Sequence, residues 1–267
     1  MLRGTVNSHE KLLVEKFLVY DLNGYMLELS IVIPTYNEEN NIKNTLHSVQ
    51  NYLVQKQLNA EILVVDDGST DGTQEILRQR TKMIPMLRIQ LNAHNHGKGY
   101  VIRQGILSAR GRLILFMDAD HSAHIRELDK LTPYIRQEYD IVMGSRRLKD
   151  PSVTITQPKL RHILGEIYIL LARVLLWTPS LDYNCGFKLF KRDSAQRLFS
   201  KQVMNDWSFD VETFLLAKKL NLKIKEVSIN WSHGYASKVK PLYDGLKSFL
   251  ALLKLRFYDM QGRYKVN

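Results

Sequence analysis

Short apolar runs alternate with longer amphipathic segments between residues 29 and 147. The longer segments repeat their apolar residues at helical spacing, whereas the short runs are rich in Val, Ile and Leu, as buried strands are. Because strands that alternate with helices form βαβ units, the pattern predicts an α/β fold with a mainly parallel sheet and right-handed crossovers. The predicted strands are LSIVIP (29–34), EILVVDD (61–67), LRIQLN (87–92), RLILFMD (112–118) and DIVMGSR (140–146), and the predicted helices cover residues 40–57, 70–82, 99–111 and 125–137.

The pattern changes after residue 150. The segment KDPSVTITQPK (149–159) contains two prolines and is predicted to be a loop. Beyond it we predict an apolar helix over 160–177, a strand within 182–192, a helix over 210–221, a strand within 222–233 and an amphipathic helix over 241–259. The expected organisation is an N-terminal extension (1–28), one main domain (29–240) and a C-terminal helix or tail (241–267).

A polar cluster follows each predicted strand of the first half. In open parallel sheets, ligands bind beyond the carboxyl ends of the strands, so these clusters are predicted to line one site. The strand interiors ILVV and LILF are hydrophobic throughout, which is typical of strands covered on both faces. The clusters are TYNEEN (35–40), DDGSTDGT (66–73), NAHNHGKG (92–99), DADHS (118–122) and GSRR (144–147).

Asp118 and Asp120 place two like charges at the end of the apolar run RLILFM. Paired carboxylates within reach of one small cation suit Mg²⁺ or Mn²⁺, which prefer oxygen ligands and commonly share them with substrate phosphates. The alternative is an acidic loop that begins the next helix, since Asp favours a helix N-terminus. The position at the carboxyl edge of the sheet favours the metal.

The glycine-containing clusters are compatible with nucleotide binding. Asp66 or Asp67 could bond a base or ribose, Gly68 permits a sharp turn, and Lys98 at a helix start is a plausible neighbour of phosphate. The alternative is ordinary loop structure, in which Thr70 or Asp71 caps the following helix. The spacing matches neither a P-loop nor G-x-G-x-x-G.

Composition and net charge limit the classes of partner that this chain is expected to bind. Lys and Arg outnumber Asp and Glu by 38 to 27 in this 267-residue chain, and the net charge of +11 suits anionic partners such as nucleotide phosphates or acidic lipids. The acidic clusters argue against nucleic acid, because paired carboxylates repel phosphate unless a metal intervenes. The single cysteine, Cys185, excludes an intrachain disulfide and indicates a reducing compartment. No run approaches the roughly 18 apolar residues of a membrane span, so we expect a soluble or membrane-surface protein.

Taken together, these motifs resemble a known family. IPTYNE, VVDDGSTDGT, GKG, DAD and GSR are similar to the nucleotide-sugar-binding half of the family 2 glycosyltransferases, which have the inverting GT-A fold. Four later motifs resemble the polyprenyl-phosphate glycosyltransferases, and among these most of all the dolichyl-phosphate β-glucosyltransferases, with the mannosyltransferases second. The later motifs are D-x-x-CGFKLFKR (182–192), W-SFDVE (207–212), EVSINW (226–231) and G-x-x-SKV (234–239).

The resemblance, which covers residues 29 to about 240, implies a Rossmann-like, mainly parallel sheet flanked by helices, with acceptor-side helices near the C-terminus. It implies metal-dependent transfer of a hexose, glucose before mannose, from a UDP- or GDP-sugar to a polyprenyl phosphate. Ser122 stands where the mannosyltransferases often carry Gln, which leaves a third protein ligand to the metal in doubt. The implied donor-binding residues are Pro34, Tyr36, Glu38, Val65, Asp66, Asp67, Lys98, Asp118, Ala119, Asp120, Arg146 and Lys238; the metal ligands are Asp118 and Asp120, and the catalytic residues are Asp120, Arg146 and Asp210.

The acceptor decides whether a base is needed. A lipid monophosphate is already anionic near pH 7, so its oxygen attacks without a general base, and Asp210 would then orient Lys or Arg residues or sugar hydroxyls. The alternative, a family 2 transferase that acts on a saccharide hydroxyl, would need Asp210 or Glu212 as base.

The helices over 160–177 and 241–259 contain apolar and basic residues that suit either a membrane interface or the core. We therefore expect a peripheral protein at the cytoplasmic face of a membrane, with a membrane-protein recruiter as a further partner.

Overall fold

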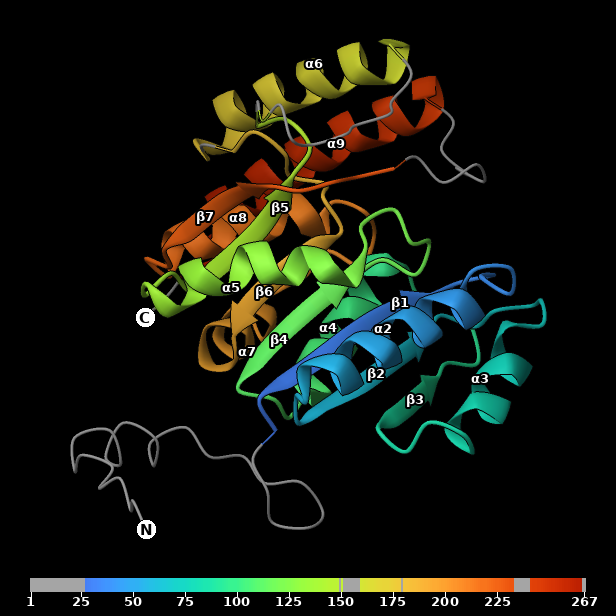
Figure 1. Ribbon diagram of the computed structural model, residues 1–267. Coiled ribbons are helices and arrows are strands. Elements are labelled where there is room, and N and C mark those ends of the chain that lie inside the picture. The colour runs from blue at the N-terminus through green and yellow to red at the C-terminus, as the bar shows by residue number, and fades with distance from the viewer. Residues whose placement is uncertain (1–26, 149, 151–158, 179, 233–240, 266–267) are drawn as a thin grey trace, which may run out of the picture.

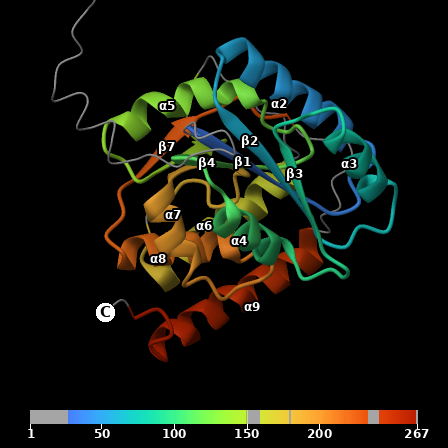
Figure 2. The same cartoon turned by 90° about the horizontal axis from the view of Figure 1, so that it is seen from below.

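The computed structural model describes residues 27–148, 150, 159–178, 180–232 and 241–265. A seven-stranded sheet lies at its centre, with the strand order β3-β2-β1-β4-β6-β5-β7. Two helical layers cover the sheet, as Figures 1 and 2 show. The strands are β1 (Leu29–Thr35), β2 (Ala60–Asp66), β3 (Leu87–Leu91), β4 (Leu113–Met117), β5 (Ile141–Ser145), β6 (Phe187–Lys191) and β7 (Ile224–Ser228).

The strands of the first half pair in parallel, as their alternation with helices predicted. β1 lies between β2 and β4, and β5 pairs in parallel with β7. β6 is the exception, because it runs antiparallel between β4 and β5 and joins the two parallel groups. The predicted α/β class with a mainly parallel sheet is therefore confirmed, and the one reversed strand brings the CGFK segment beside the end of β4.

One face of the sheet is covered by α2 (Ile42–Lys56), α3 (Thr73–Thr81) and α5 (Leu128–Arg136). The core on this side includes Ile33, Val64, Leu115 and Phe187 from the strands. Because successive strand residues point to opposite faces, their neighbours Val32, Ile114 and Phe116 pack on the other side. Both faces of the central strands are buried under helices, which explains the unbroken apolar sequences of these strands.

The second face is covered by α4 (Lys98–Ser108), α7 (Arg192–Phe199) and α8 (Phe209–Lys219). The sequence pattern did not predict α7, a short helix that follows β6 directly. Two long helices, α6 (Lys159–Leu176) and α9 (Pro241–Met260), pack against each other beside this layer. Among the described residues, no helix is both long and apolar enough to cross a bilayer. The predicted extension over 1–28 and loop over 149–159 fall almost entirely outside the described residues.

Candidate active site

Two loops at the carboxyl edge of the sheet are bound tightly to each other. The loop after β1 and the loop after β2 exchange hydrogen bonds: the Asn37 amide donates to Ser69 Oγ at 2.8 Å, and the Thr70 amide donates to Asn37 Oδ1 at 2.8 Å. The Glu38 amide likewise donates to Thr73 Oγ1 at 2.8 Å. The TYNEEN and DDGSTDGT clusters therefore form one rigid wall, as their shared sheet edge predicted.

Asp66 and Asp67 hold this wall in place. Asp66 is fully buried, and its carboxylate accepts hydrogen bonds from Thr35 Oγ1 at 3.0 Å and from the Ser69 amide at 2.9 Å. Asp67 accepts from the amides of His96 and Gly97 at 2.8 and 2.9 Å, which ties the third loop to the second. Burial raises the pKa of Asp67, and these two hydrogen bonds offset only part of that effect.

The other donor-pocket residues differ in what they expose. Pro34 and Val65 are opposite each other in the paired strands β1 and β2, and both are buried. Val65 packs with Leu63 and Val101 on the side of α4. Tyr36 is exposed at 41%, and Glu38 accepts a hydrogen bond from Asn41. Lys238 lies outside the described residues.

Asp118 and Asp120 lie directly beyond β4. The Asp118 amide donates to the carbonyl of Gly186 at 3.0 Å, and a Cβ at position 186 would lie 1.8 Å from Asp118 Oδ2. Any side chain at position 186 would therefore displace this carboxylate. Asp120 is exposed, and its Oδ1 accepts a hydrogen bond from the Ser122 amide at 3.0 Å. Ala119 between them is buried, and its carbonyl accepts from Thr45 Oγ1 at 2.7 Å.

The aspartates do not begin the next helix. That helix begins with a 3₁₀ turn at Ile125, and its cap is His124, whose Nδ1 accepts a hydrogen bond from the Arg126 amide at 3.1 Å. The helix-start alternative for Asp118 and Asp120 is therefore wrong.

Carboxylate oxygens are the ligands that a hard divalent cation prefers, so the chemistry of this pair fits Mg²⁺ or Mn²⁺. No cluster of three or more His, Cys, Asp or Glu side chains suited to a metal occurs in the described part of the chain. The remaining ligands would be phosphate and water oxygens.

Lys98 joins Asp118 to the helical layer. Its ammonium lies 2.6 Å from Asp118 Oδ1 and 4.4 Å from the centre of the Trp207 ring. Burial lowers the pKa of Lys98, but the carboxylates of Asp118 and Asp210 more than offset this, so its pKa lies above the ordinary value. Lys98 therefore keeps its positive charge at neutral pH, at the start of α4.

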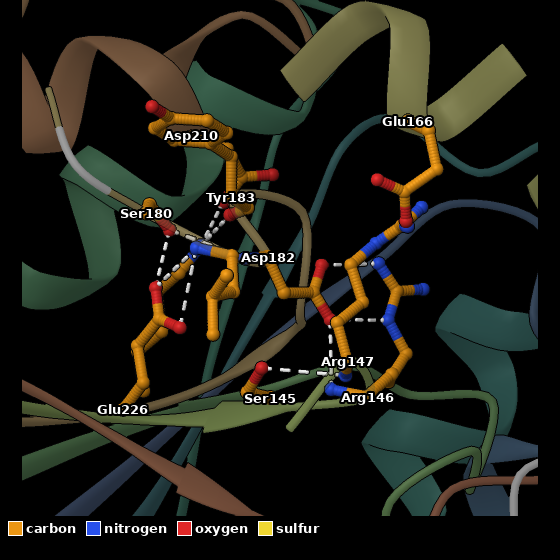
Figure 3. Close-up of polar contacts among 11 residues, drawn as sticks. Ser145, Arg146, Arg147, Glu166, Ser180, Asp182, Tyr183, Asp210 and Glu226 are labelled. Atoms are coloured by element: carbon orange, nitrogen blue, oxygen red, sulfur yellow. Dashed lines mark hydrogen bonds and ion pairs between the residues drawn. The ribbon is translucent and has the colours of Figure 1, made fainter. Parts of the chain in front are cut away.

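Arg146, which follows β5, is held by Asp182 (Figure 3). Its Nε and Nη2 donate to the two oxygens of the Asp182 carboxylate at 2.7 and 2.6 Å, and its own amide donates to Oδ2 at 2.9 Å. The guanidinium also lies 5.1 Å from the centre of the Trp231 ring. Burial raises the pKa of Asp182, yet Arg146 outweighs burial and keeps that pKa below its usual range. The bidentate pair thus fixes the direction of the guanidinium.

The segment that carries Asp182 is fixed in turn by β7. The Glu226 carboxylate accepts hydrogen bonds from the Ser180 hydroxyl and from the Leu181 amide, the latter at 2.9 Å (Figure 3). Next to Arg146, Arg147 forms an ion pair with Glu166 of α6. The edge of the site after β5 is therefore connected to the pair of long helices.

Asp210, at the start of α8, forms a buried ion pair with Lys188 of β6. Lys188 Nζ also donates to the Tyr183 carbonyl at 2.9 Å, and both charged side chains are almost completely buried. Burial raises the pKa of Asp210, and Lys188 offsets part of this rise. Asp210 therefore contacts a lysine, and its role in catalysis stays a prediction.

Glu212 is part of the core. Its carboxylate accepts hydrogen bonds from the amides of Val203 and Met204 at 2.7 and 2.9 Å and from the Tyr264 hydroxyl at 2.7 Å. The side chain is fully buried, so it is not placed to act as a general base. Cys185 is also buried, and burial raises the pKa of its thiol to about 12, which leaves it unreactive at neutral pH.

Sequence reasoning missed Asp182, Lys188 and Trp207, although all three lie in quoted motifs. Lys188 carried a detectable signal, because a lysine between Phe187 and Leu189 in a buried strand needs a partner. Asp182 and Trp207 carried none, since their roles depend on residues distant in the sequence.

Comparison with known proteins identifies the family of this chain. The model of the family "Glycosyl transferase family 2" matches residues 30–199. A dolichyl-phosphate beta-glucosyltransferase of Drosophila melanogaster is 34% identical over 253 residues, which cover 90% of this chain and 78% of the relative. The Dictyostelium discoideum protein of the same name is 31% identical over 250 residues, or 89% and 76% of the two chains.

A solved structure shares the fold. Glucosyl-3-phosphoglycerate synthase from Mycobacterium tuberculosis, crystallised with Mn²⁺, UDP-glucose and phosphoglyceric acid, matches with a TM-score of 0.64 at 18% identity, over 86% of this chain and 80% of that one. The predicted GT-A fold is confirmed by this likeness. On the family match and the two relatives, the chain belongs to glycosyl transferase family 2.

Proposed function

We propose that this protein transfers glucose, with inversion, from UDP-glucose to a dolichyl or related polyprenyl phosphate. The observation that carries the proposal is the grouping, at one edge of the sheet, of the Asp118 and Asp120 carboxylates with the cations Lys98 and Arg146. The names of the relatives support the sugar and the lipid acceptor, and the Mn²⁺ and UDP-glucose bound by the fold neighbour support the donor.

A divalent cation held by Asp118 and Asp120 would supply charge neutralisation for the departing diphosphate. Either Mg²⁺ or Mn²⁺ suits two carboxylates. Around the two carboxylates, the loops after β1 and β2 would hold the nucleoside. Tyr36, Glu38 and Asp67 would line the edge of the nucleoside pocket. Pro34, Val65 and Asp66 would support these loops from the core side. Lys98 and Ala119 would face the diphosphate, and Lys238 would contribute a further cation.

Arg146 is suited to a phosphate group. The Arg146 guanidinium is held by Asp182 through Nε and Nη2 and lies against the Trp231 ring. Because the guanidinium is already oriented, it loses little conformational freedom when it binds an anion. The lipid phosphate oxygen would attack the sugar carbon on the side opposite the diphosphate. No protein base is needed, and Asp210 instead stays paired with Lys188.

The direct test is a transfer assay with labelled UDP-glucose, Mg²⁺ or Mn²⁺ and a short polyprenyl phosphate. Label is expected to move into the organic phase only when the cation and the lipid phosphate are both present. GDP-mannose in place of UDP-glucose is the control, and we expect it to be the poorer donor. Transfer to a saccharide with none to the lipid would replace this proposal by the hydroxyl-acceptor alternative.

We further propose that α6 and α9 rest on the cytoplasmic face of a membrane. Each helix carries a row of exposed apolar side chains at helical spacing, and the Arg147–Glu166 ion pair connects α6 to the site. Lys254 and Arg256 of α9 are exposed and suit anionic headgroups. The rows are Ile163, Ile167, Leu170 and Val174 of α6, extended by Trp177, and Leu250, Leu253, Phe257 and Met260 of α9.

Vesicle binding tests this surface. Trp177→Ser combined with Phe257→Ser is expected to weaken binding to vesicles that contain phosphatidylserine by about 10²- to 10³-fold, because the loss of each ring removes roughly 2 kcal/mol of apolar burial. The matched control is Val54→Ser with Met83→Ser, two exposed apolar residues elsewhere. Equal binding by both double variants would contradict the surface, and no vesicle binding by the unaltered protein would favour a membrane-protein recruiter.

A further inference from the structure

Both oxygens of the partly exposed Asp118 carboxylate already lie close to other groups of the protein. Oδ2 is turned onto the backbone of Gly186, where even the Cβ of an alanine would lie 1.8 Å away. Oδ1, which would lie 2.8 Å from the same Cβ, forms an ion pair with the ammonium of Lys98 at 2.6 Å. A divalent cation that binds Asp118 through Oδ1 would therefore compete with the Lys98 ammonium for that oxygen.

The Lys98 ammonium can also be stabilised by the nearby aromatic ring of Trp207. This ammonium already lies 4.4 Å from the ring centre of Trp207, and that ring is 60% exposed at the margin of the site. A cation stabilised by an aromatic face can move along it without losing all of its favourable contacts. Lys188 differs in this respect, because Asp210 and the Tyr183 carbonyl hold it in a site closed to solvent.

We propose that Lys98 is an exchangeable counter-ion: it neutralises Asp118 Oδ1 while no divalent cation is bound, yields that oxygen to the cation, and then pairs with the donor diphosphate. The inference rests on the proposed function, because it assumes the cation site at Asp118 and Asp120. It also predicts that binding of the divalent cation and binding of the donor diphosphate depend on each other. The cation binds weakly alone, and the diphosphate strengthens cation binding because it gives the displaced ammonium a new partner.

Binding of Mn²⁺ and UDP to Lys98→Met separates exchange from a merely structural ion pair. Without nucleotide, the variant is expected to bind Mn²⁺ at least about fivefold more tightly, since no ammonium competes for Asp118. With Mn²⁺ present, it is expected to bind UDP about tenfold more weakly, since a charge-assisted contact is lost. Titration calorimetry and the paramagnetic resonance signal of free Mn²⁺ measure both affinities without any turnover.

Arg147→Met is the matched control for loss of one nearby positive charge, because Arg147 pairs with Glu166 rather than with an aspartate of the site. Its Mn²⁺ affinity is expected to change less than about twofold. If Lys98→Met binds Mn²⁺ no better than the unaltered protein does, the exchange is refuted. In that case, the cation site of the proposed function is still supported if Asp120→Asn abolishes Mn²⁺ binding. If neither the unaltered protein nor Lys98→Met binds Mn²⁺, even with UDP present, the proposed function fails as well.

Lysine footprinting follows the same exchange in the unaltered protein and does not depend on how the variant folds. Reductive methylation of Lys98 is expected to be slow without ligands, several-fold faster at Mn²⁺ concentrations that occupy the site, and slow again when UDP is added. Lys188 should stay unreactive and Lys223, whose side chain is 66% exposed, should stay reactive throughout. A Lys98 rate that does not change when Mn²⁺ binds would overturn the proposal.

Discussion

Asp120→Asn is expected to reduce glucosyl transfer by about 10³-fold or more while the protein stays folded. Asparagine keeps the oxygen that accepts the Ser122 amide hydrogen but removes the negative charge that would bind the cation. The side chain is exposed, so the midpoint of thermal unfolding should change by no more than about 2 °C. The transfer assay and a thermal melt of the same preparation measure the two effects.

Asp129→Asn is the matched control for this prediction. Asp129 is an exposed aspartate of α5 that pairs with Lys56 and accepts the Tyr52 hydroxyl at 2.9 Å, away from the carboxyl edge. This variant should transfer glucose at the rate of the unaltered protein. An Asp120→Asn protein that retains a tenth of the activity would show that Asp120 does not bind the essential cation.

Lys188→Met is expected to lower the free energy of unfolding by about 3–5 kcal/mol near neutral pH. The substitution leaves the Asp210 carboxylate buried without its cation, because Lys188 and Asp210 are only 1% and 2% exposed. Methionine fills most of the lysine volume beside Phe116 and Phe209, so the loss is mainly electrostatic. Urea unfolding followed by circular dichroism measures it.

The double variant Lys188→Met, Asp210→Leu identifies the cause of this loss. With both charges replaced by apolar groups, most of the stability should return, whereas transfer should remain impaired because the site has lost its supporting pair. If the double variant is as unstable as Lys188→Met, the loss comes from packing and the unpaired carboxylate is not its cause.

The loss in the free energy of unfolding of Lys188→Met should also depend on pH. Burial raises the pKa of Asp210 above its unfolded value, and without Lys188 nothing nearby offsets that rise as strongly. The folded state then binds a proton that the unfolded state has already released, so stability increases as pH falls through the raised pKa. The loss of stability relative to the unaltered protein should therefore become smaller as the pH is lowered from neutral toward the raised pKa. The double variant, which lacks the carboxyl group, should show no such narrowing.

Much of the site follows from local sequence. The apolar run before Asp118 predicted a buried strand, and β4 ends at Met117 with both aspartates directly beyond it. Lys98 was predicted at a helix start, and it is the first residue of α4. Such features can be predicted because burial patterns and helix starts depend on residues within a few positions of one another.

The partners of these residues depend on topology instead. Asp182 bonds Arg146 across 36 residues, and Lys188 pairs with Asp210 across 22, in each case because β6 runs antiparallel between β4 and β5. The same strand places Gly186 against Asp118. A strand's apolar pattern does not say which neighbours it joins or in which direction it runs, since hydrophobic burial has no direction.

Local sequence patterns therefore predicted the α/β class, most of the strands and helices, and the carboxyl edge where the polar clusters meet. The ion pairs are visible only in the folded protein, where Lys98 pairs with Asp118, Asp182 with Arg146, and Asp210 with Lys188. This difference follows from the distance along the chain over which each interaction acts. Periodicity acts between neighbours along the chain, whereas ion pairs between buried side chains form only after the strand order has brought distant segments together.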